Sequence, residues 1–336
     1  MKKFTKFYSV LFLAALLSCQ KSEEKLDPQS NKCLITQTDN YDGTKLSYTV
    51  NYEYDENKNL VKRTSKYTTG KIYIENYKNE YDSNKNLIKV TLTDQDSKLH
   101  SVIDYVYYST GKVKTKTEQS HVYNKIKMTT EYNLEGKEIY YSGKSPNDNY
   151  ERKTSYDSKN NMIFQESTQN GQLDLTVINT YNENNKIIKS IYKGGFNSTK
   201  EYTYDQTGKL VKTVDHTGLE TTFISGSDKT IRESESKRNG VYVSSEKSEF
   251  TSEGNLIKTF FSHNKKDYSL IADYTYHTNS VPKTQKIYDF KKNSKTEVFM
   301  TYDVVYNEKG QALNVKIYDK DTYLISYSYE NKFNCQ

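Results

Sequence analysis

Two short stretches carry side-chain oxygens at alternating positions, a spacing that can coordinate calcium. They are Asp55–Asn59, with the sequence DENKN, and Asp82–Asn86, with the sequence DSNKN. The common calcium loop also has a glycine at its sixth position and a glutamate at its twelfth. Here the twelfth position holds Lys66 in one stretch and Thr93 in the other. We interpret both stretches as hairpin turns whose Asp and Asn side chains bond their own backbone, and we predict no metal site and no cofactor.

Catalytic side chains do not converge on a known arrangement. The histidines are scattered, with no His and carboxylate pair at metal-binding spacing: His100, His121, His216, His263 and His277. No G-x-S-x-G, H-E-x-x-H or phosphate-binding glycine loop is present in the sequence. A glycosidase-like carboxylate pair stays open at this level. Carboxylates that recur in turns are a poor place for such a pair, and we predict a protein without enzymatic activity.

The first eighteen residues are typical of a targeting segment. Lys2, Lys3 and Lys6 precede a short apolar run, Val10–Leu17, which is too short for a permanent transmembrane helix. The run ends in Leu-Leu-Ser-Cys, which resembles a bacterial lipobox. The resemblance implies cleavage after residue 18 and a lipid on Cys19, although Leu17 is larger than the usual residue there. The alternative is an ordinary signal peptide with a chance cysteine.

Residues 19–31 are predicted to form the lipidated cysteine and a flexible tether. Lys21, Glu23 and Glu24 follow Cys19 and resemble the export tag of some surface lipoproteins. This resemblance implies an outer-membrane protein exposed on the cell surface. A solvated charged spacer at the inner face of the outer membrane would have the same composition.

The other two cysteines, Cys33 and Cys335, lie at the two extremes of the remaining chain. An exported protein can form disulfides. A linear array would hold its ends far beyond the roughly 7 Å limit between bridged Cα atoms. Either the array curls until its ends meet or the two cysteines are separate buried caps, and we favour the caps.

Charge and composition exclude some partners and indicate how the chain is buried. Removal of residues 1–18 takes away three lysines and no acid, so the formal charge falls from +6 to +3. Basic and acidic residues are interspersed, which argues against nucleic acid as a partner. Only 34% of the residues are hydrophobic, yet there are 33 tyrosines. Tyrosine must therefore supply much of the buried area.

A repeating unit explains the tyrosines. Residues 202–218 read YTYDQTGKLVKTVDHTG, and partial copies recur at a spacing of 21 to 30 residues. Before each turn the apolar residues fall on alternate positions, as in Leu46, Tyr48 and Val50. Such alternation predicts half-buried strands rather than helices. Gly111, Gly136 and other glycines or asparagines stand where a hairpin needs a left-handed residue, four residues after the aligned aromatic.

We therefore predict an all-β fold for residues 32–336, an array of antiparallel β-hairpins with about 22 to 24 strands. A flat sheet of that size is unstable, so the sheet should curl or spiral and cover its tyrosine face with the next turn of the sheet. A transmembrane barrel would need a continuous apolar outer band. We reject it because Lys and Glu occur on both faces of the strands.

The unit Y-x-Y-D-x-x-G-x-L is similar to the YD repeat of Rhs and teneurin-type proteins. The full motif occurs once, at Tyr202–Leu210, and partial copies cover most of residues 45–333. The residues that carry the resemblance are Tyr52, Tyr54, Asp55, Leu60, Tyr81, Asp82, Leu87, Tyr156, Asp157, Tyr202, Tyr204, Asp205, Gly208 and Leu210. The resemblance implies a curling sheet of hairpins and, in some family members, a cell-surface contact module. This chain has a longer period, and no toxin domain follows its last repeat, so a toxin-delivery role is not implied.

These observations predict a non-catalytic outer-membrane lipoprotein that acts as an interaction or adhesion scaffold. Its expected partners are the membrane, through the lipid on Cys19, and an extracellular protein or glycan. One alternative is a glycan-binding accessory lipoprotein of a nutrient-uptake system. Another is an immunity or antitoxin-like partner protein.

Overall fold

The computed structural model describes residues 33–122, 125–195, 197–225, 230–278, 280–291, 294 and 297–334. The predicted signal peptide, the lipid-bearing Cys19 and the predicted export tag, Lys21, Glu23 and Glu24, lie outside the described residues. No helix in the described part of the chain is long and apolar enough to cross a lipid bilayer.

The regular elements of the described chain are 24 β-strands. Their bounds are β1 Leu34–Asp42, β2 Lys45–Tyr54, β3 Leu60–Tyr67, β4 Ile72–Tyr81, β5 Leu87–Asp94, β6 Leu99–Tyr107, β7 Val113–Ser120, β8 Lys127–Tyr132, β9 Glu138–Lys144, β10 Asn149–Tyr156, β11 Met162–Gln169, β12 Gln172–Tyr181, β13 Ile187–Gly194, β14 Ser198–Tyr204, β15 Leu210–Asp215, β16 Leu219–Ser225, β17 Ile231–Arg238, β18 Val241–Phe250, β19 Leu256–Ser262, β20 Ser269–Tyr276, β21 Pro282–Phe290, β22 Val298–Tyr306, β23 Ala312–Tyr318 and β24 Ile325–Asn334. This confirms the predicted all-β meander and its strand number.

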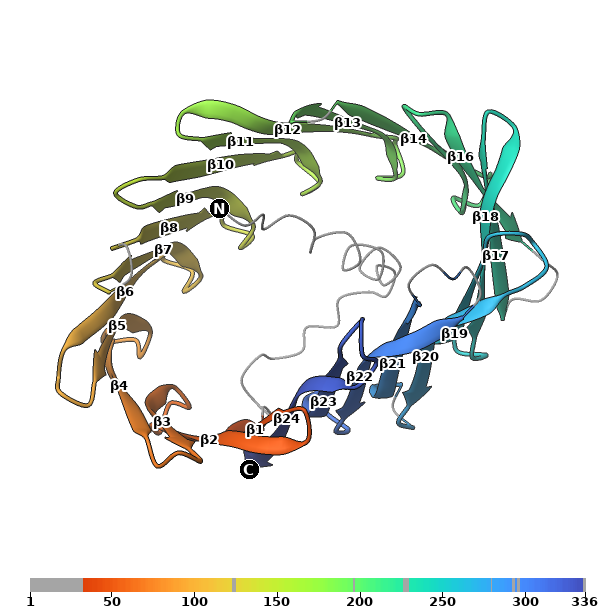
Figure 1. Ribbon diagram of the computed structural model, residues 1–336. Coiled ribbons are helices and arrows are strands. Elements are labelled where there is room, and N and C mark those ends of the chain that lie inside the picture. Colours follow the sequence, from red (N-terminus) through yellow and green to blue (C-terminus); the bar gives the residue numbers. More distant parts are fainter. Residues whose placement is uncertain are drawn as a thin grey trace.

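The sheet closes into a barrel. Each strand pairs antiparallel with the next, and β24 returns to pair with β1 over eight positions, from Leu34 opposite Asn334 to Asp42 opposite Tyr327. Figure 1 shows the resulting ring, with the first and last strands side by side. The predicted open, curled or spiral sheet is therefore wrong. The strands turn steadily until the two edges meet, and closure removes the unpaired edges that an open sheet would expose.

The barrel is wide and one sheet thick. With a spacing of about 4.8 Å between strands and a tilt of about 40°, a ring of this many strands is roughly 45–50 Å across between opposite backbones. Side chains cannot fill such a hollow. In the described residues all strands belong to one sheet, so the prediction that a second layer of sheet covers the tyrosine face is also wrong.

The two faces of the sheet differ in chemistry. On the aromatic face, Tyr48, Val50 and Tyr52 of β2 lie opposite Tyr67, Ser65 and Arg63 of β3. Small side chains on this face are buried beneath their larger neighbours, as Val50, Ser65, Ser190, Val304 and Val315 show. The other face carries ion pairs between adjacent strands, among them Lys62 with Glu53 at 3.2 Å and Lys212 with Glu220 at 2.7 Å.

The hairpin turns form two rims, which we name by their composition. The aspartate rim contains the turns that join each even-numbered strand to the next odd-numbered strand, from β2–β3 to β22–β23. The aromatic rim contains the turns from β1–β2 to β23–β24. The residue four positions after the aligned aromatic has positive φ in ten turns of the aspartate rim, as predicted. They are Lys58, Lys85, Gly111, Gly136, Asn160, Asn185, Gly208, Gly254, Ser280 and Gly310.

The first strand begins and the last strand ends at the aspartate rim, at Leu34 and Asn334. The pair β24 and β1 thus forms a twelfth hairpin unit that has no turn. Cys33 immediately precedes β1, is 3% exposed and is disulfide-bonded. Its carbonyl accepts a hydrogen bond of 2.6 Å from the side chain of Gln311. The expectation that the two ends of the repeat array lie far apart is wrong, because Leu34 and Asn334 are paired. The reason for preferring two separate cap cysteines therefore no longer holds.

We predict that Cys335 is the disulfide partner of Cys33. Cys335 lies outside the described residues, but Leu34 and Asn334, next to the two cysteines in the chain, are paired. Peptide mapping without reductant should recover a Cys33–Cys335 peptide, and reduction should lower the free energy of unfolding by about 2–5 kcal/mol. Recovery of both cysteines as free thiols, or of a Cys19–Cys33 peptide, would contradict this pairing.

Gly194 should be the least replaceable glycine of the aromatic rim. Its φ is +137°, and a Cβ there would stand 2.0 Å from the carbonyl oxygen of Asp174. We expect Gly194→Ala to lower the free energy of unfolding by about 3 kcal/mol or more, because the backbone at Asp174 would have to move to make room for the Cβ. Gly70→Ala is the control: its φ is +86° with open space around it, and its expected cost is about 1 kcal/mol. Equal costs in urea denaturation would refute this prediction.

Candidate binding sites at the barrel rims

Most described turns of the aspartate rim are held by their first side chain. In the turn after β14, one carboxylate oxygen of Asp205 accepts hydrogen bonds of 2.9 Å from the backbone amides of Thr207 and Lys209. The same geometry recurs in other turns with Asp or Asn as the first residue: Asp82, Asn133, Asp157, Asn182 and Asn307. These acceptors relieve backbone amides that a tight turn leaves without a partner.

The predicted motif carboxylates therefore serve the turns. In Asp55, one oxygen accepts the amide of Asn59 at 2.8 Å, and the other accepts the hydroxyl of Tyr81 at 2.5 Å. Burial acts to raise the pKa of Asp55, but these hydrogen bonds outweigh it and the pKa is lowered. In the part of the chain that the structure describes, no group of three or more His, Cys, Asp or Glu residues is placed to hold a metal ion.

Tyrosine hydroxyls connect several hairpins to the one before them. The hydroxyl of Tyr204 donates to the carbonyl of Ile187 at 2.8 Å, and that of Tyr107 donates to Leu87 at 2.8 Å. The same bond is made by Tyr54 to Ile35, Tyr156 to Glu138, Tyr181 to Met162 and Tyr276 to Leu256. Burial raises the pKa of these tyrosines. The second tyrosine of the motif is thus a link between repeats.

The other motif residues lie in the strands and turns of the repeats and have structural roles there. Tyr52 and Tyr202 lie on the aromatic face, and Gly208 occupies the left-handed position of its turn. Leu60, Leu87 and Leu210 each begin the strand after a turn, opposite the aligned tyrosine. Each such pairing falls at a register shift, as expected for a turn that ends in a β-bulge.

Sequence reasoning missed two kinds of residue. Asn79 and Asn179 stand two positions before the aligned tyrosine, and each amide donates to the carbonyl that begins the preceding return strand, Leu60 or Met162. The recurring Asn could have been a signal for this bond. Sequence reasoning also missed partly exposed ion pairs across strands, such as Arg152 with Glu138 at 2.7 Å. Nothing in the local pattern relates these two positions, which are fourteen residues apart in the chain.

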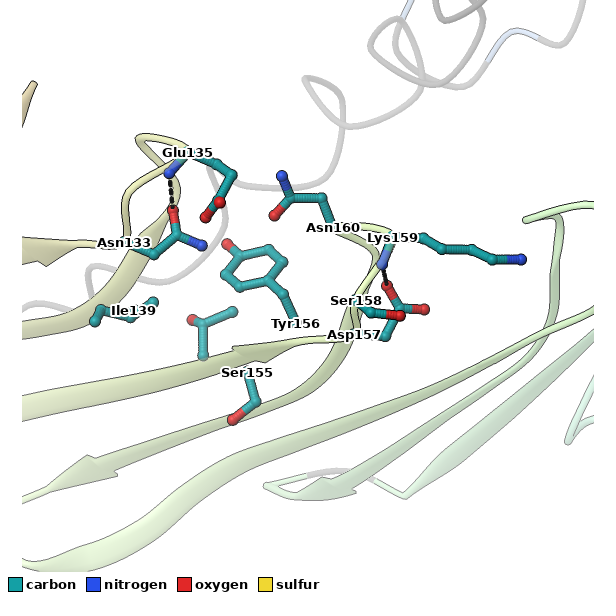
Figure 2. Close-up of a pocket in the computed structure, with 10 residues that line it drawn as sticks. Asn133, Glu135, Ile139, Ser155, Tyr156, Asp157, Ser158, Lys159 and Asn160 are labelled. Atoms are coloured by element: carbon teal, nitrogen blue, oxygen red, sulfur yellow. Dashed lines mark hydrogen bonds between the residues drawn. The ribbon is translucent and has the colours of Figure 1, made fainter. Parts of the chain in front are cut away.

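Grooves lie between neighbouring turns of the aspartate rim. One, of about 600 Å³, lies between the turns after β8 and β10 and includes Asn133, Glu135, Ile139 and Tyr156. Figure 2 shows the Tyr156 ring lying between these two turns, with the side chain of Ser155 on the other side of the strand. A groove of about 700 Å³ repeats this arrangement between the turns after β4 and β6, and a third of about 330 Å³ lies where the chain ends meet.

The grooves share a simple chemistry. In each, an Asp or Asn turn forms one wall and a tyrosine stands nearby. In the first two grooves this tyrosine, Tyr156 or Tyr107, belongs to the adjacent repeat, whereas in the third Tyr54 directly precedes the Asp55 turn. Such walls offer hydrogen-bond acceptors beside an aromatic ring, which suits a polar ligand with an apolar side. The lowered pKa values of Asp82 and Asp157 keep their carboxylates ionised at neutral pH.

The sequence matches no protein-family model and no curated protein. Among solved structures it is similar to a part of the TcdB2-TccC3-TEV crystal structure, with 12% identity, 84% of this chain and 16% of that chain covered, and a TM-score of 0.32. It thus spans about a sixth of that chain. A porin-like protein from Bacteroides uniformis shows 9% identity, with 89% of this chain and 98% of that chain covered, and a TM-score of 0.26. At these TM-scores neither likeness carries an argument about function.

Replacement of Asp205 tests the role of the turn carboxylates. Hydrogen bonds from the Thr207 hydroxyl and the amides of Lys209 and Thr207 hold the pKa of Asp205 below its ordinary value of 3.8. The stability that ionisation contributes is therefore complete above about pH 4 and is lost as the pH falls through the lowered pKa. We expect Asp205→Ala to lower the urea midpoint at pH 7, and by less at pH 2.

The matched control is Asp205→Asn. Asn begins the equivalent turn in other repeats, so the amide oxygen should keep the backbone bonds and most of the stability at pH 7. If the Ala and Asn variants unfold at the same urea concentration, the carboxylate of Asp205 does not hold its turn.

Proposed function

We propose that this chain is a YD-repeat-like outer-membrane lipoprotein that acts at the cell surface as a non-catalytic interaction scaffold. The sequence of residues 1–31 supports the export and the lipid anchor. The partner that this scaffold would bind is an extracellular protein or glycan. Paired Lys and Glu residues on the charged face argue against nucleic acid, which favours a concentrated basic surface.

The observation that carries this proposal is the repetition of one groove around a closed ring. Closure through β1 and β24 keeps neighbouring turns at fixed positions, so a groove between two turns is preformed. Two grooves of this kind occur between turns that belong to different repeats, and a third lies between a turn and the β1–β24 seam. A rigid ring with repeated shallow grooves suits a partner that makes several weak contacts at once.

The carboxylates favour binding over hydrolysis. Glycoside hydrolysis needs a carboxylic acid of raised pKa beside a second carboxylate. Hydrogen bonds lower the pKa of the turn carboxylates at Asp82, Asp157 and Asp205. Burial does raise the pKa of Glu246. Its register partners, however, are Ser234 and Phe261, neither of which is a carboxylate.

A glycan-binding accessory role is the second candidate. The walls of the grooves favour it, because a tyrosine ring stands beside Asn, Asp and Glu side chains. Sugars present hydroxyl groups at their edges and apolar C–H groups on their faces, and these walls complement both.

Protease treatment of intact cells tests the location, and a glycan array tests the ligand. We expect the wild-type protein to be cleaved on intact cells. The variant Cys19→Ala and the triple variant Lys21→Ala/Glu23→Ala/Glu24→Ala should be protected.

Purified protein should bind a subset of the arrayed glycans. Glu135→Ala should weaken this binding at least about tenfold, because it removes one charged hydrogen-bonding contact. Lys78→Ala, on the charged face, is the control.

Protection of the wild-type protein on intact cells would place it in the periplasm and contradict surface exposure. A blank array would reject the glycan role and leave a protein partner. Hydrolysis of any arrayed glycan by the purified protein would overturn the non-catalytic proposal.

A further inference from the structure

The aromatic rim exposes large apolar side chains at the tips of its hairpins. Val241 is 69% exposed and Leu324 is 70% exposed, and Tyr73 and Leu173 are each 54% exposed. These residues lie at or beside four different turns of this rim. Exposed apolar side chains scattered singly are ordinary, but a set gathered at one end of a molecule indicates a contact surface.

Aromatic rings gather with three of these residues, Tyr73, Val241 and Leu324, in three patches. In the first, at β2–β4, the Tyr67 ring stacks on Tyr48 at 4.9 Å and meets the edge of Tyr73 at 5.5 Å. In the second, at β17–β20, the Lys265 ammonium lies 4.9 Å from the Tyr242 ring. In the third, at β21–β24, Phe299 packs against Tyr323 at 4.7 Å.

The three patches follow one another along one half of the ring. The second patch, at β17–β20, adjoins the third, at β21–β24, and only β1 separates the third from the first. Figure 1 shows these strands as one arc of the barrel, with β11 and β12, whose turn carries Leu173, on the opposite side. Turns at one end of a closed barrel form a rim, and an arc of contacts with a further contact opposite it defines a plane. This geometry suits a flat surface better than a single peptide or loop.

Basic side chains accompany the apolar ones at two of the three patches, whereas the turn of the third patch contains Asp319 and Asp321 beside Lys320. Exposed Lys66 and Lys71 flank the first patch. Lys237, Arg238, Lys265 and Lys266 flank the second patch, where the acidic groups are Glu235 and Asp267. Tyrosine and aliphatic residues mixed with lysine are typical of surfaces at the interface between membrane and water. The same lysines would repel the rim of a second copy, which disfavours a rim-to-rim dimer.

The tether predicted from the sequence is long enough for this arrangement. Residues 19 to 33 can span roughly 45–50 Å when extended. The strands of 6 to 10 residues make a barrel wall only about 20–25 Å high at a tilt of about 40°. A lipid on Cys19 can therefore reach a bilayer at the aromatic rim, although β1 begins at the aspartate rim.

We propose that the aromatic rim seats the barrel upright on an anionic lipid surface, with the aspartate rim and its grooves facing away from the bilayer. This inference deepens the proposed function, on which it rests for the lipid anchor. The lipid tail supplies the attachment, and the rim sets the orientation.

The test uses the mature polypeptide from Gln20 onward, without leader or lipid, because it contains all 24 strands. Its flotation is measured with vesicles of phosphatidylcholine alone and with vesicles of phosphatidylcholine and phosphatidylglycerol in equal amounts. We expect binding to the anionic vesicles that weakens with salt. The variant Tyr73→Ser/Leu173→Ser/Leu324→Ser should bind at least about tenfold more weakly, because apolar area drives insertion at the interface.

The matched control is Leu134→Ser/Ile163→Ser, which removes exposed apolar side chains from the aspartate-rim end of the barrel and should bind as the wild type. Lys66→Gln/Lys71→Gln should weaken binding to anionic vesicles severalfold. Circular dichroism verifies that each variant retains its β-sheet.

Three results would overturn the inference: no flotation of the unlipidated polypeptide, equal weakening by the aromatic-rim and control variants, or a dimer that the aromatic-rim variant dissociates. The proposed function fails separately, if Cys19→Ala leaves the protein attached to intact cells. The two failures are therefore distinguishable.

Discussion

Hydrogen bonds between β1 and β24 are the constraint on which the rest of this structure depends. They give every strand two neighbours, in a sheet that has no second layer in the described residues. Without them, the two outer strands would expose unpaired backbone groups along their full length. Side chains strengthen the seam: the hydroxyl of Thr38 bonds the side chain of Asn331 at 2.7 Å, and that of Tyr327 bonds Asn40 at 2.6 Å.

Because the described strands form a single layer, their stability is distributed among contacts between neighbouring hairpins. Buried small residues such as Val50 and Ser190 lie between larger side chains of the same face. Tyrosine hydroxyls bond many hairpins to the preceding one, and Asp or Asn side chains hold many of the turns. A repeat protein gains stability from each such interface, so a long sheet can be built from modest local terms. The high tyrosine content follows from this, since tyrosine buries a ring and still bonds a backbone carbonyl.

The two rims are the part of the structure that relates most directly to function. Antiparallel hairpins place alternate turns at opposite ends of the barrel, so two families of turn become two chemically different surfaces. The aspartate rim offers preformed polar grooves, whereas the aromatic rim gathers exposed apolar and basic side chains. This polarity would let one end bind a partner while the other rests on a membrane.

The sequence by itself determined the strands, the turns and the approximate number of hairpins. Those features depend on residues that are close in the chain. Alternate positions along a strand face one side, and Asn or Gly tolerates the positive φ that the turn needs four residues after the aligned aromatic. It did not determine closure, the meeting of Leu34 with Asn334, or ion pairs such as Arg152 with Glu138. Closure requires the small rotations of all hairpins to add to one full circle, and no short pattern encodes that sum. Only the tertiary structure decided that the ends meet, that Cys33 lies at the seam, and that the apolar turns gather at one rim.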